Sequence, residues 1–194
     1  MSSFIAHSLI GFTVGAQKEQ PSLKHTLIAS LFFIVLASTP DLDYIVNWLR
    51  GYQMPVRYSH SIGFVFVIGL LSLLFRNAVL RKSLHRIPVY LFFLAPATHL
   101  ILDGLVAVHG NPYLFPFTDA MLTFPIGILP SSGYVNIFNY YLWRNLSIEL
   151  LILIPVVITL TPKLRHFAFR SKWLKALLAF LFVVGLLIGW NLQR

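Results

Sequence analysis

Histidines and carboxylates are the residues of this chain whose types and spacing could do chemistry. The 194-residue sequence holds seven His, six acidic residues and no Cys. Without thiolates, a metal ion would have to be held by His, Asp, Glu, backbone or water oxygens, which suits a hydrolytic metal such as zinc or manganese. Four short motifs supply the candidate metal ligands, which are His7, Asp41, Asp43, His60, His99 and Asp103.

The sharpest motif is the pair His99 and Asp103. These residues are four apart in an apolar run, so on a helix their side chains share one face about one turn apart. An Asp at membrane depth costs several kcal/mol unless it has a partner, a water cavity or an ion. The pair therefore predicts a shared cation, and a His–Asp hydrogen bond that only ties two helices together is the alternative.

Two further motifs stand at the ends of apolar runs. Pro40 interrupts a helical run just before Asp41 and Asp43, and such a turn can aim both carboxylates at one cation. His60 lies between two serines ahead of the next apolar run, where a neutral imidazole could be a metal ligand or a general base. Solvated Asp residues at a helix end and an interfacial His are the alternatives.

His7, on the first and short apolar run, is ambiguous by itself. Taken together, the four motifs support one another as parts of a single site. Together they could hold one zinc-like ion, or two bridged by a carboxylate. Asp41 or His60, or else Asp43, would accept the proton of an attacking water. Of the remaining polar residues, Arg57 could contact an anionic headgroup, Glu149 could orient a ligand histidine, and Asp119 is a weaker candidate that also fits a solvated loop acid.

The elements that must position these residues are apolar runs. Hydrophobic residues make up 57% of the chain and the mean hydropathy is +0.77, too apolar for an ordinary soluble fold of this size. We expect an all-α polytopic membrane bundle forming a single domain over residues 1–194. Six apolar runs predict its helices: Phe4–Ala16, Thr26–Trp48, Ser61–Phe75, Ile87–Val108, Leu146–Leu160 and Leu174–Trp190.

Some of these runs are shorter than the about 20 residues that a perpendicular span requires, so they are re-entrant, tilted or extended by their flanks. The intervening segment His109–Arg144 is rich in Pro, Gly and aromatic residues and predicts a long interfacial loop. The first residues lack the basic segment of a secretory signal peptide, so we expect no cleavage there.

Basic residues indicate the orientation of the chain. If all six runs span, the loops on one side carry 11 Lys and Arg and the opposite side carries 4. The positive-inside rule then places both termini outside the cytoplasm. Five of the six acidic residues, all except Glu19, fall on the outer side with the four candidate metal motifs.

Several function classes are disfavoured. The net charge of +9 is explained by basic loops between apolar runs, so no nucleic-acid partner is expected. Nucleophile elbow, Walker loop, zincin helix and dinucleotide fingerprint are missing, which leaves metal-assisted chemistry. The rival functions are a metal-ion or proton transporter or channel, and a structural membrane protein with a non-catalytic metal site.

At the same residues the sequence resembles the YdjM-like family of bacterial inner-membrane proteins. The ordered motifs are an early His, Pro-Asp-x-Asp, a Thr-His-Ser-like step, His-x-x-x-Asp, and a Gly-x-Pro with an aromatic-Pro-Phe stretch, matched by His7, Pro40–Asp43, Ser59–Ser61, His99–Asp103, Gly110–Pro112 and Phe115–Phe117. The similarity extends to about residue 120. One departure is that Arg57 here has no additional His before it, as the family's His-Arg-Gly would supply.

The resemblance implies a membrane-bound metal-dependent hydrolase. The family's motif pattern is also similar to that of zinc-dependent phospholipase C and P1-type nuclease proteins, which suggests phosphoester hydrolysis by analogy. We therefore expect zinc, or alternatively manganese, as one or more ions, and a membrane lipid or lipid-linked substrate. The site would face the extracytoplasmic side of the bacterial inner membrane.

Overall fold

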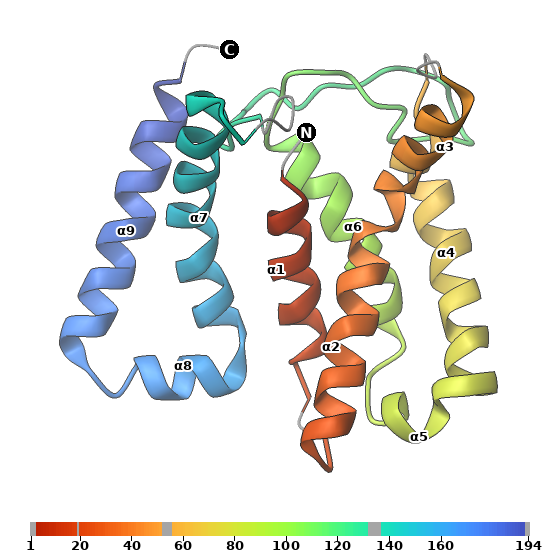
Figure 1. The fold of residues 1–194 in the computed structure, drawn as a ribbon, viewed down its shortest axis with the longest axis horizontal. Coiled ribbons are helices and arrows are strands. Elements are labelled where there is room, and N and C mark those ends of the chain that lie inside the picture. The colour runs from red at the N-terminus through yellow and green to blue at the C-terminus, as the bar shows by residue number, and fades with distance from the viewer. Residues whose placement is uncertain (1–2, 19, 52–55, 132–136, 193–194) are drawn as a thin grey trace.

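The computed structural model describes residues 3–18, 20–51, 56–131 and 137–192, which form helices joined by turns and one long loop (Figure 1). The expected all-α class is confirmed, with an isolated β-bridge between Asn111 and Leu122 inside the loop. In chain order the helices are α1 (Phe4–Gly15), α2 (Leu23–Ser38), the 3₁₀ turn η1 (Thr39–Leu42), α3 (Asp43–Arg50), the 3₁₀ turn η2 (Tyr58–His60), α4 (Ile62–Phe75), the π-helical η3 (Arg76–Leu80), α5 (Arg81–Leu84), α6 (Tyr90–Gly104), α7 (Tyr140–Leu160), α8 (Pro162–Ala168) and α9 (Lys172–Trp190).

Membrane-spanning length is reached by four helical segments within the described residues. They are Leu23–Asn47, Ile62–Leu84, Tyr140–Leu160 and Lys172–Trp190, whereas the apolar segments Phe4–Gly15 and Tyr90–Val106 are shorter. All six predicted runs are thus helical, and the chain is a polytopic helical membrane protein. The two largest extensions beyond the predicted runs arise because α4 continues through η3 into α5 and because Asn139 caps α7 by accepting a hydrogen bond from the Tyr141 amide.

Helix α6 is shorter than predicted, ending at Gly104 instead of Val108. The loop that follows turns back onto the helix end. The amides of Ile128 and Leu129 donate to the carbonyl oxygen of Leu105 at 2.8 and 3.0 Å. These bonds satisfy a carbonyl that the terminated helix would otherwise leave without a partner.

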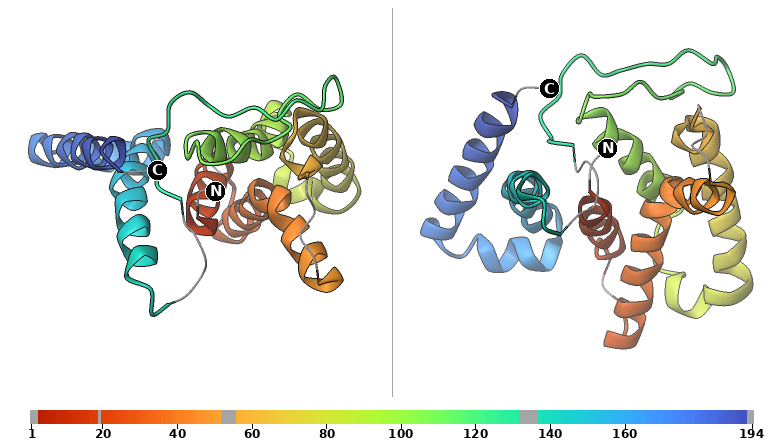
Figure 2. Two further views of the ribbon diagram at one scale, coloured as in Figure 1. Left: turned by 90° about the horizontal axis from the view of Figure 1, so that it is seen from above. Right: turned by 45° about the horizontal axis from the view of Figure 1, so that its top comes forward.

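The two ends of the molecule differ in content. The start of α1, the end of α9, α3 and the loop between α6 and α7 lie at one end, while α5, α8 and the α1–α2 turn lie at the other (Figure 1). Figure 2 shows the long loop running across the first end, passing beside α4 before it returns to α7. The basic segments of the sequence therefore gather at one end, as the predicted topology requires; Glu19 lies outside the described residues.

Helices α1 and α2 are in especially close contact. A Cβ added at Gly11 would lie 2.6 Å from the Phe33 carbonyl oxygen and 2.8 Å from Ile34 Cα, and at Gly15 3.0 Å from the Ala29 oxygen. Glycines four residues apart let membrane helix backbones approach where a larger residue would hold them apart. This contact determines how the first residues of α1 meet the end of α2.

The last three helices form a hairpin that packs beside α1 (Figure 1). Its buried core joins Ile148 and Ile152 of α7 to Ala6 and Ile10 of α1 and to Leu102 of α6. A separate apolar cluster, which includes Phe33, Phe92 and Leu84, fills the space among α2, α5 and α6 nearer the basic end.

Candidate metal centre

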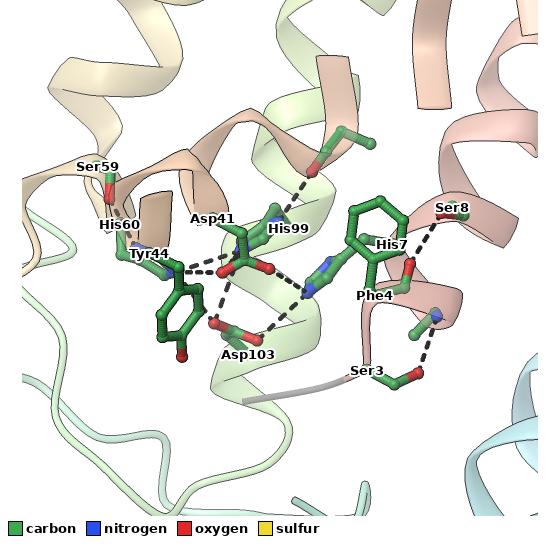
Figure 3. Close-up of polar contacts among 12 residues, drawn as sticks. Ser3, Phe4, His7, Ser8, Asp41, Tyr44, Ser59, His60, His99 and Asp103 are labelled. Atoms are coloured by element: carbon green, nitrogen blue, oxygen red, sulfur yellow. Dashed lines mark hydrogen bonds and ion pairs between the residues drawn. The ribbon is translucent and has the colours of Figure 1, made fainter. Parts of the chain in front are cut away.

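Five of the six predicted metal ligands come together at the ends of four separate segments (Figure 3). One group contains His7, Asp41 and His99, and a second contains His60, His99 and Asp103; in each group the ligand atoms lie within 4.8 Å of one another. His99 belongs to both groups, so the five side chains form one cluster. We call His7, Asp41, His60, His99 and Asp103 the His/Asp cluster.

The α1–α2 contact explains how residues 34 positions apart meet. His7, Gly11 and Gly15 recur every four residues and so share one face of α1. On α2, Phe33 and Ala37 are also four residues apart, and Asp41 follows after another four residues, in η1. Because the two helices run in opposite directions (Figure 1), the close backbone contact at Gly11 and Gly15 leads to a meeting of His7 with Asp41, whose Nε2 and Oδ2 are 3.9 Å apart.

Helix α6 holds His99 with its Nε2 atom toward the cluster. Its Nδ1 lies 2.9 Å from the carbonyl oxygen of Ala37. A carbonyl oxygen only accepts hydrogen bonds, so Nδ1 carries a proton, and in the neutral ring Nε2 then presents its lone pair. The His7 and His99 rings are stacked, with centroids 3.6 Å apart.

A second chain of hydrogen bonds orients His60. The Ser59 hydroxyl donates to Asp43 Oδ2 at 2.9 Å and lies 3.0 Å from His60 Nδ1. Its single proton is used on the carboxylate, so Ser59 must accept from a protonated Nδ1. The Nε2 of His60 then also turns a lone pair toward the cluster.

These two imidazoles create a requirement for a positive charge. The Nε2 atoms of His60 and His99 are 3.2 Å apart, and when both rings are neutral both of these atoms are acceptors. Two lone pairs at this distance repel each other unless a proton or a cation lies between them. The donor set therefore fits a metal ion, in the way that metal-bound histidines have their other ring nitrogen fixed by a hydrogen bond.

The spacing of the donor atoms fits the same conclusion. The Nε2 of His60 is 3.6 Å from Asp41 Oδ1 and 3.3 Å from Asp103 Oδ2, and the Nε2 of His99 is 3.6 and 3.7 Å from the same two oxygens. Nitrogen and oxygen ligands about 2.0–2.2 Å from a tetrahedral zinc ion are about 3.3–3.6 Å from one another. The buried cluster could thus hold a metal ion.

The carboxylates offer different oxygens to the two sides of the cluster. His7 Nε2 lies nearest Asp41 Oδ2 and Asp103 Oδ1, at 3.9 and 3.6 Å. His60 and His99 lie nearest Asp41 Oδ1 and Asp103 Oδ2. Both carboxylates stand between the two sides, as bridging ligands do in two-metal sites.

Asp43 and Arg57 flank the cluster. The Arg57 guanidinium donates to both oxygens of Asp43 at 2.6 and 2.7 Å, and to Asp41 Oδ1 at 3.1 Å. Burial by itself would lower the pKa of Arg57, but the hydrogen bonds to Asp43 and the negative charges nearby raise it above its usual value. Asp41, Asp43 and Asp103 are negative and Arg57 is positive. With neutral histidines, one divalent cation would balance the negative charge that remains.

The structure therefore separates two predicted ligands that the sequence presents alike. Asp41 belongs to the His/Asp cluster, whereas Asp43 binds Arg57 and Ser59 and comes only within 3.9 Å of His60 Nδ1. Arg57, predicted to contact a headgroup, holds both carboxylates. The bonds of Ser59 and of the Ala37 carbonyl were not foreseen, because nothing in the residue types reveals them.

The two predicted outer carboxylates lie elsewhere. Glu149 on α7 is buried and accepts a hydrogen bond from the Ser3 amide at 2.9 Å, so it bonds to the start of α1 and not to a histidine. Asp119 is exposed in the long loop. The structure thus leaves the His/Asp cluster as the meeting point of five predicted ligands from α1, η1, η2 and α6.

Helical spans and a buried His/Asp cluster at one end define the class of this molecule: a polytopic helical membrane protein with a possible metal site. The family model that describes the YdjM inner membrane protein matches residues 1–193. The chain therefore belongs to the YdjM inner membrane protein family, and the match continues well beyond the ordered motifs of the first half. No curated protein and no solved structure matched the chain.

Proposed function

We propose that this protein is a membrane-bound metal-dependent hydrolase that cleaves a phosphoester of a lipid or lipid-linked substrate. The observation that carries the proposal is the pair of imidazole nitrogens of His60 and His99, which face each other across 3.2 Å between two carboxylates. A divalent metal bound there would supply a Lewis acid for a phosphoryl oxygen and lower the pKa of a water. Zinc fits the nitrogen and oxygen donors, with manganese as the alternative.

Within the cluster, Asp41 is the residue best placed to receive a proton. Its side chain is 14% exposed, whereas those of His7, His60 and His99 are fully buried and that of Asp103 is 1% exposed. Water reaching the cluster would therefore meet Asp41 first. Because a carboxylate within hydrogen-bond reach can act as a general base, Asp41 takes this role, and His60 is the other candidate.

Asp43 and Arg57 position these groups. Asp43 receives the Ser59 hydroxyl proton, which leaves Ser59 to fix the ring of His60. Arg57 is 17% exposed along its side chain while bonded to Asp41 and Asp43. Its positive charge at the edge of the cluster would also attract the phosphate of an anionic headgroup.

The position of the cluster favours a substrate that belongs to the membrane. The cluster lies where α2 and α6 end and α4 begins, at the end crossed by the aromatic loop (Figures 1 and 2). Aromatic residues of such loops commonly lie at headgroup depth. The basic segments at the opposite end favour an extracytoplasmic position for this site by the positive-inside rule.

Transport of a metal ion or proton is the rival function. A permeation path needs polar groups through the depth of the bilayer. Among the described residues, the space among α2, α5 and α6 toward the basic end is filled by an apolar cluster that includes Phe33, Leu84 and Phe92. This favours a site open to one face.

Metal content and turnover test the proposal together. Detergent-purified wild type, freed of affinity-tag histidines, should contain one or two zinc or manganese ions per chain by mass spectrometry, in line with one-metal and two-metal hydrolytic sites. It should also release the headgroup or phosphate from phospholipids. His99→Ala should lose both properties, while His166→Ala, which alters a histidine of α8 at the opposite end, should keep both.

Wild type that neither contains nor rebinds metal would overturn the proposal, as would full activity in His99→Ala. Orientation is tested separately with a single cysteine at position 119, which is exposed in the long loop. It should react with an impermeant thiol reagent in intact spheroplasts. Labelling only after permeabilisation would place the site on the cytoplasmic face.

A further inference from the structure

An apolar groove begins beside the metal-ligand candidate His60 and follows the first turns of α4. Its volume is about 680 Å³, and it is lined by Tyr58, Ser59, Ser61, Ile62, Gly63, Phe64, Phe66, Val67 and Phe115–Phe117. This volume falls within the range of ligand sites and far exceeds the small voids of a packed interior. Ser59 and Ser61 flank His60 in the sequence, so the groove and the His/Asp cluster share the turn η2.

The groove offers its occupant almost no hydrogen bonds. The Ser61 hydroxyl donates to the Tyr58 carbonyl and accepts from the Phe64 amide. The Ser59 hydroxyl is used by Asp43 and His60. With both serines engaged inside the protein, a polar ligand would lose its bonds to water without replacement, whereas a hydrocarbon chain would lose nothing.

One wall of the groove is held in place by backbone contacts. The amides of Ile62 and Gly63, in the first turn of α4, donate to the carbonyl oxygens of Tyr113 and Phe115, each at 2.9 Å. A Cβ at Gly63 would lie 2.7 Å from Pro116 Cδ, so only glycine lets the loop approach this closely. The groove thus exists before any ligand arrives, which reduces the cost of binding.

The other side opens toward the bilayer. Ile62, Phe66 and Val67 are about half exposed, and they lie in the span candidate Ile62–Leu84, whose most apolar stretch is largely not covered by protein. The end of the groove formed by Ser59 and Ser61 therefore lies next to His60 of the His/Asp cluster along the chain, and its apolar side faces the hydrocarbon. A lipid whose chain lay along α4 would have its headgroup beside Asp41 and Arg57.

We infer that this groove binds an acyl chain of a membrane phospholipid and so holds its phosphoester at the His/Asp cluster. The inference rests on the proposed function for the reaction, but the binding of the chain depends on the groove alone. It identifies the substrate class as glycerophospholipids, with the acyl chain as the recognised part. It also assigns to the loop Phe115–Phe117 the wall that a chain would contact.

Photolabelling tests the groove without requiring turnover. Phosphatidylglycerol carrying a diazirine in its acyl chain should label the peptides that contain residues 62–67 and 113–117 of the wild-type protein. Val67→Trp would fill the groove and should reduce this labelling about tenfold. Leu71→Trp is the matched control, because Leu71 is one turn along the same helix, is 53% exposed against 54% for Val67, and does not line the groove.

Ile62→Trp serves as a second groove-filling variant if Val67→Trp does not elute as wild type does. Equal labelling in the groove-filling and control variants would overturn the inference. Competition that favours a polyisoprenyl phosphate over dipalmitoyl phosphatidic acid would also overturn it, since the chain would not be an acyl chain.

The metal-free variant His99→Ala separates the two proposals. Labelling that persists there, together with wild type that hydrolyses no phospholipid, would support the groove and refute the hydrolase function. Hydrolysis by wild type, together with labelling that is unchanged in Val67→Trp, would refute acyl-chain binding in the groove but not the hydrolase function.

Discussion

Two regions of this molecule bury carboxylates in contrasting ways. The unit of α1, α2, η1, η2 and α6 gathers Asp41 and Asp103 with three histidines at one point. The hairpin of α7, α8 and α9 buries Glu149, whose bond goes to the backbone amide of Ser3. A buried acid that accepts a hydrogen bond from a backbone amide stabilises the fold. Two acids that face imidazole lone pairs repel them, and a bound cation would remove this repulsion. Burial alone therefore does not identify the site.

The largest expected difference separates these two kinds of buried acid. Asp103→Asn removes a negative charge and a donor oxygen from the His/Asp cluster and should weaken zinc binding by more than about 100-fold, beyond the loss typical of residues that only support a ligand. Glu149→Gln retains an oxygen that can accept from Ser3 and should leave metal affinity close to wild type. Competition with a chromophoric chelator measures both. Equal losses in the two variants would erase the distinction between the regions.

A smaller effect should come from the support around the cluster. Asp43→Asn keeps the size of the side chain but weakens its hold on Arg57 and on the Ser59 hydroxyl. Residues that orient a ligand histidine typically cost 10–100-fold in metal affinity or activity when changed. We expect a loss within about that range, with metal still bound at saturating zinc. Complete loss of the metal at saturation would instead make Asp43 a ligand.

The smallest effect on metal affinity should come from helix packing in the two regions. A Cβ at Gly11 would meet backbone atoms of Phe33 and Ile34, whereas at Gly185 it would meet first the side chain of Ile152. Backbone cannot move aside as a side chain can, so Gly11→Ala should cost about 1–3 kcal/mol of stability and Gly185→Ala less. Gly11→Ala should also reduce metal affinity by displacing His7. Thermal melts and chelator competition give the two readouts, and reduced affinity in Gly185→Ala alone would contradict the comparison.

The extent of sequence prediction differs between elements for physical reasons. The six apolar runs and the His99–Asp103 pair follow from hydropathy and helical periodicity, and the structure contains all of them. Helix ends were less predictable, because the start of α7 depends on the cap at Asn139 and the end of α6 on the returning loop. These are contacts between distant or polar groups that an apolar run does not record.

Within the site, the limit is clearest at Asp41 and Asp43. Both are carboxylates in one turn, and only the path of η1 directs Asp41 to the histidines and Asp43 to Arg57. The Gly11 contact that aligns His7 with this turn is visible as a spacing of small residues, but its partner helix is not. The roles of two neighbouring acids thus required the three-dimensional structure.

The order of the cluster along the chain has a consequence for biosynthesis. All five of its residues lie between His7 and Asp103, so the ribosome has made every one of them before it begins α7. Since chains tend to fold from the N-terminal part during synthesis, a metal ion could be captured while the last three helices are still being made. The hairpin would then join a cluster that already holds its ion.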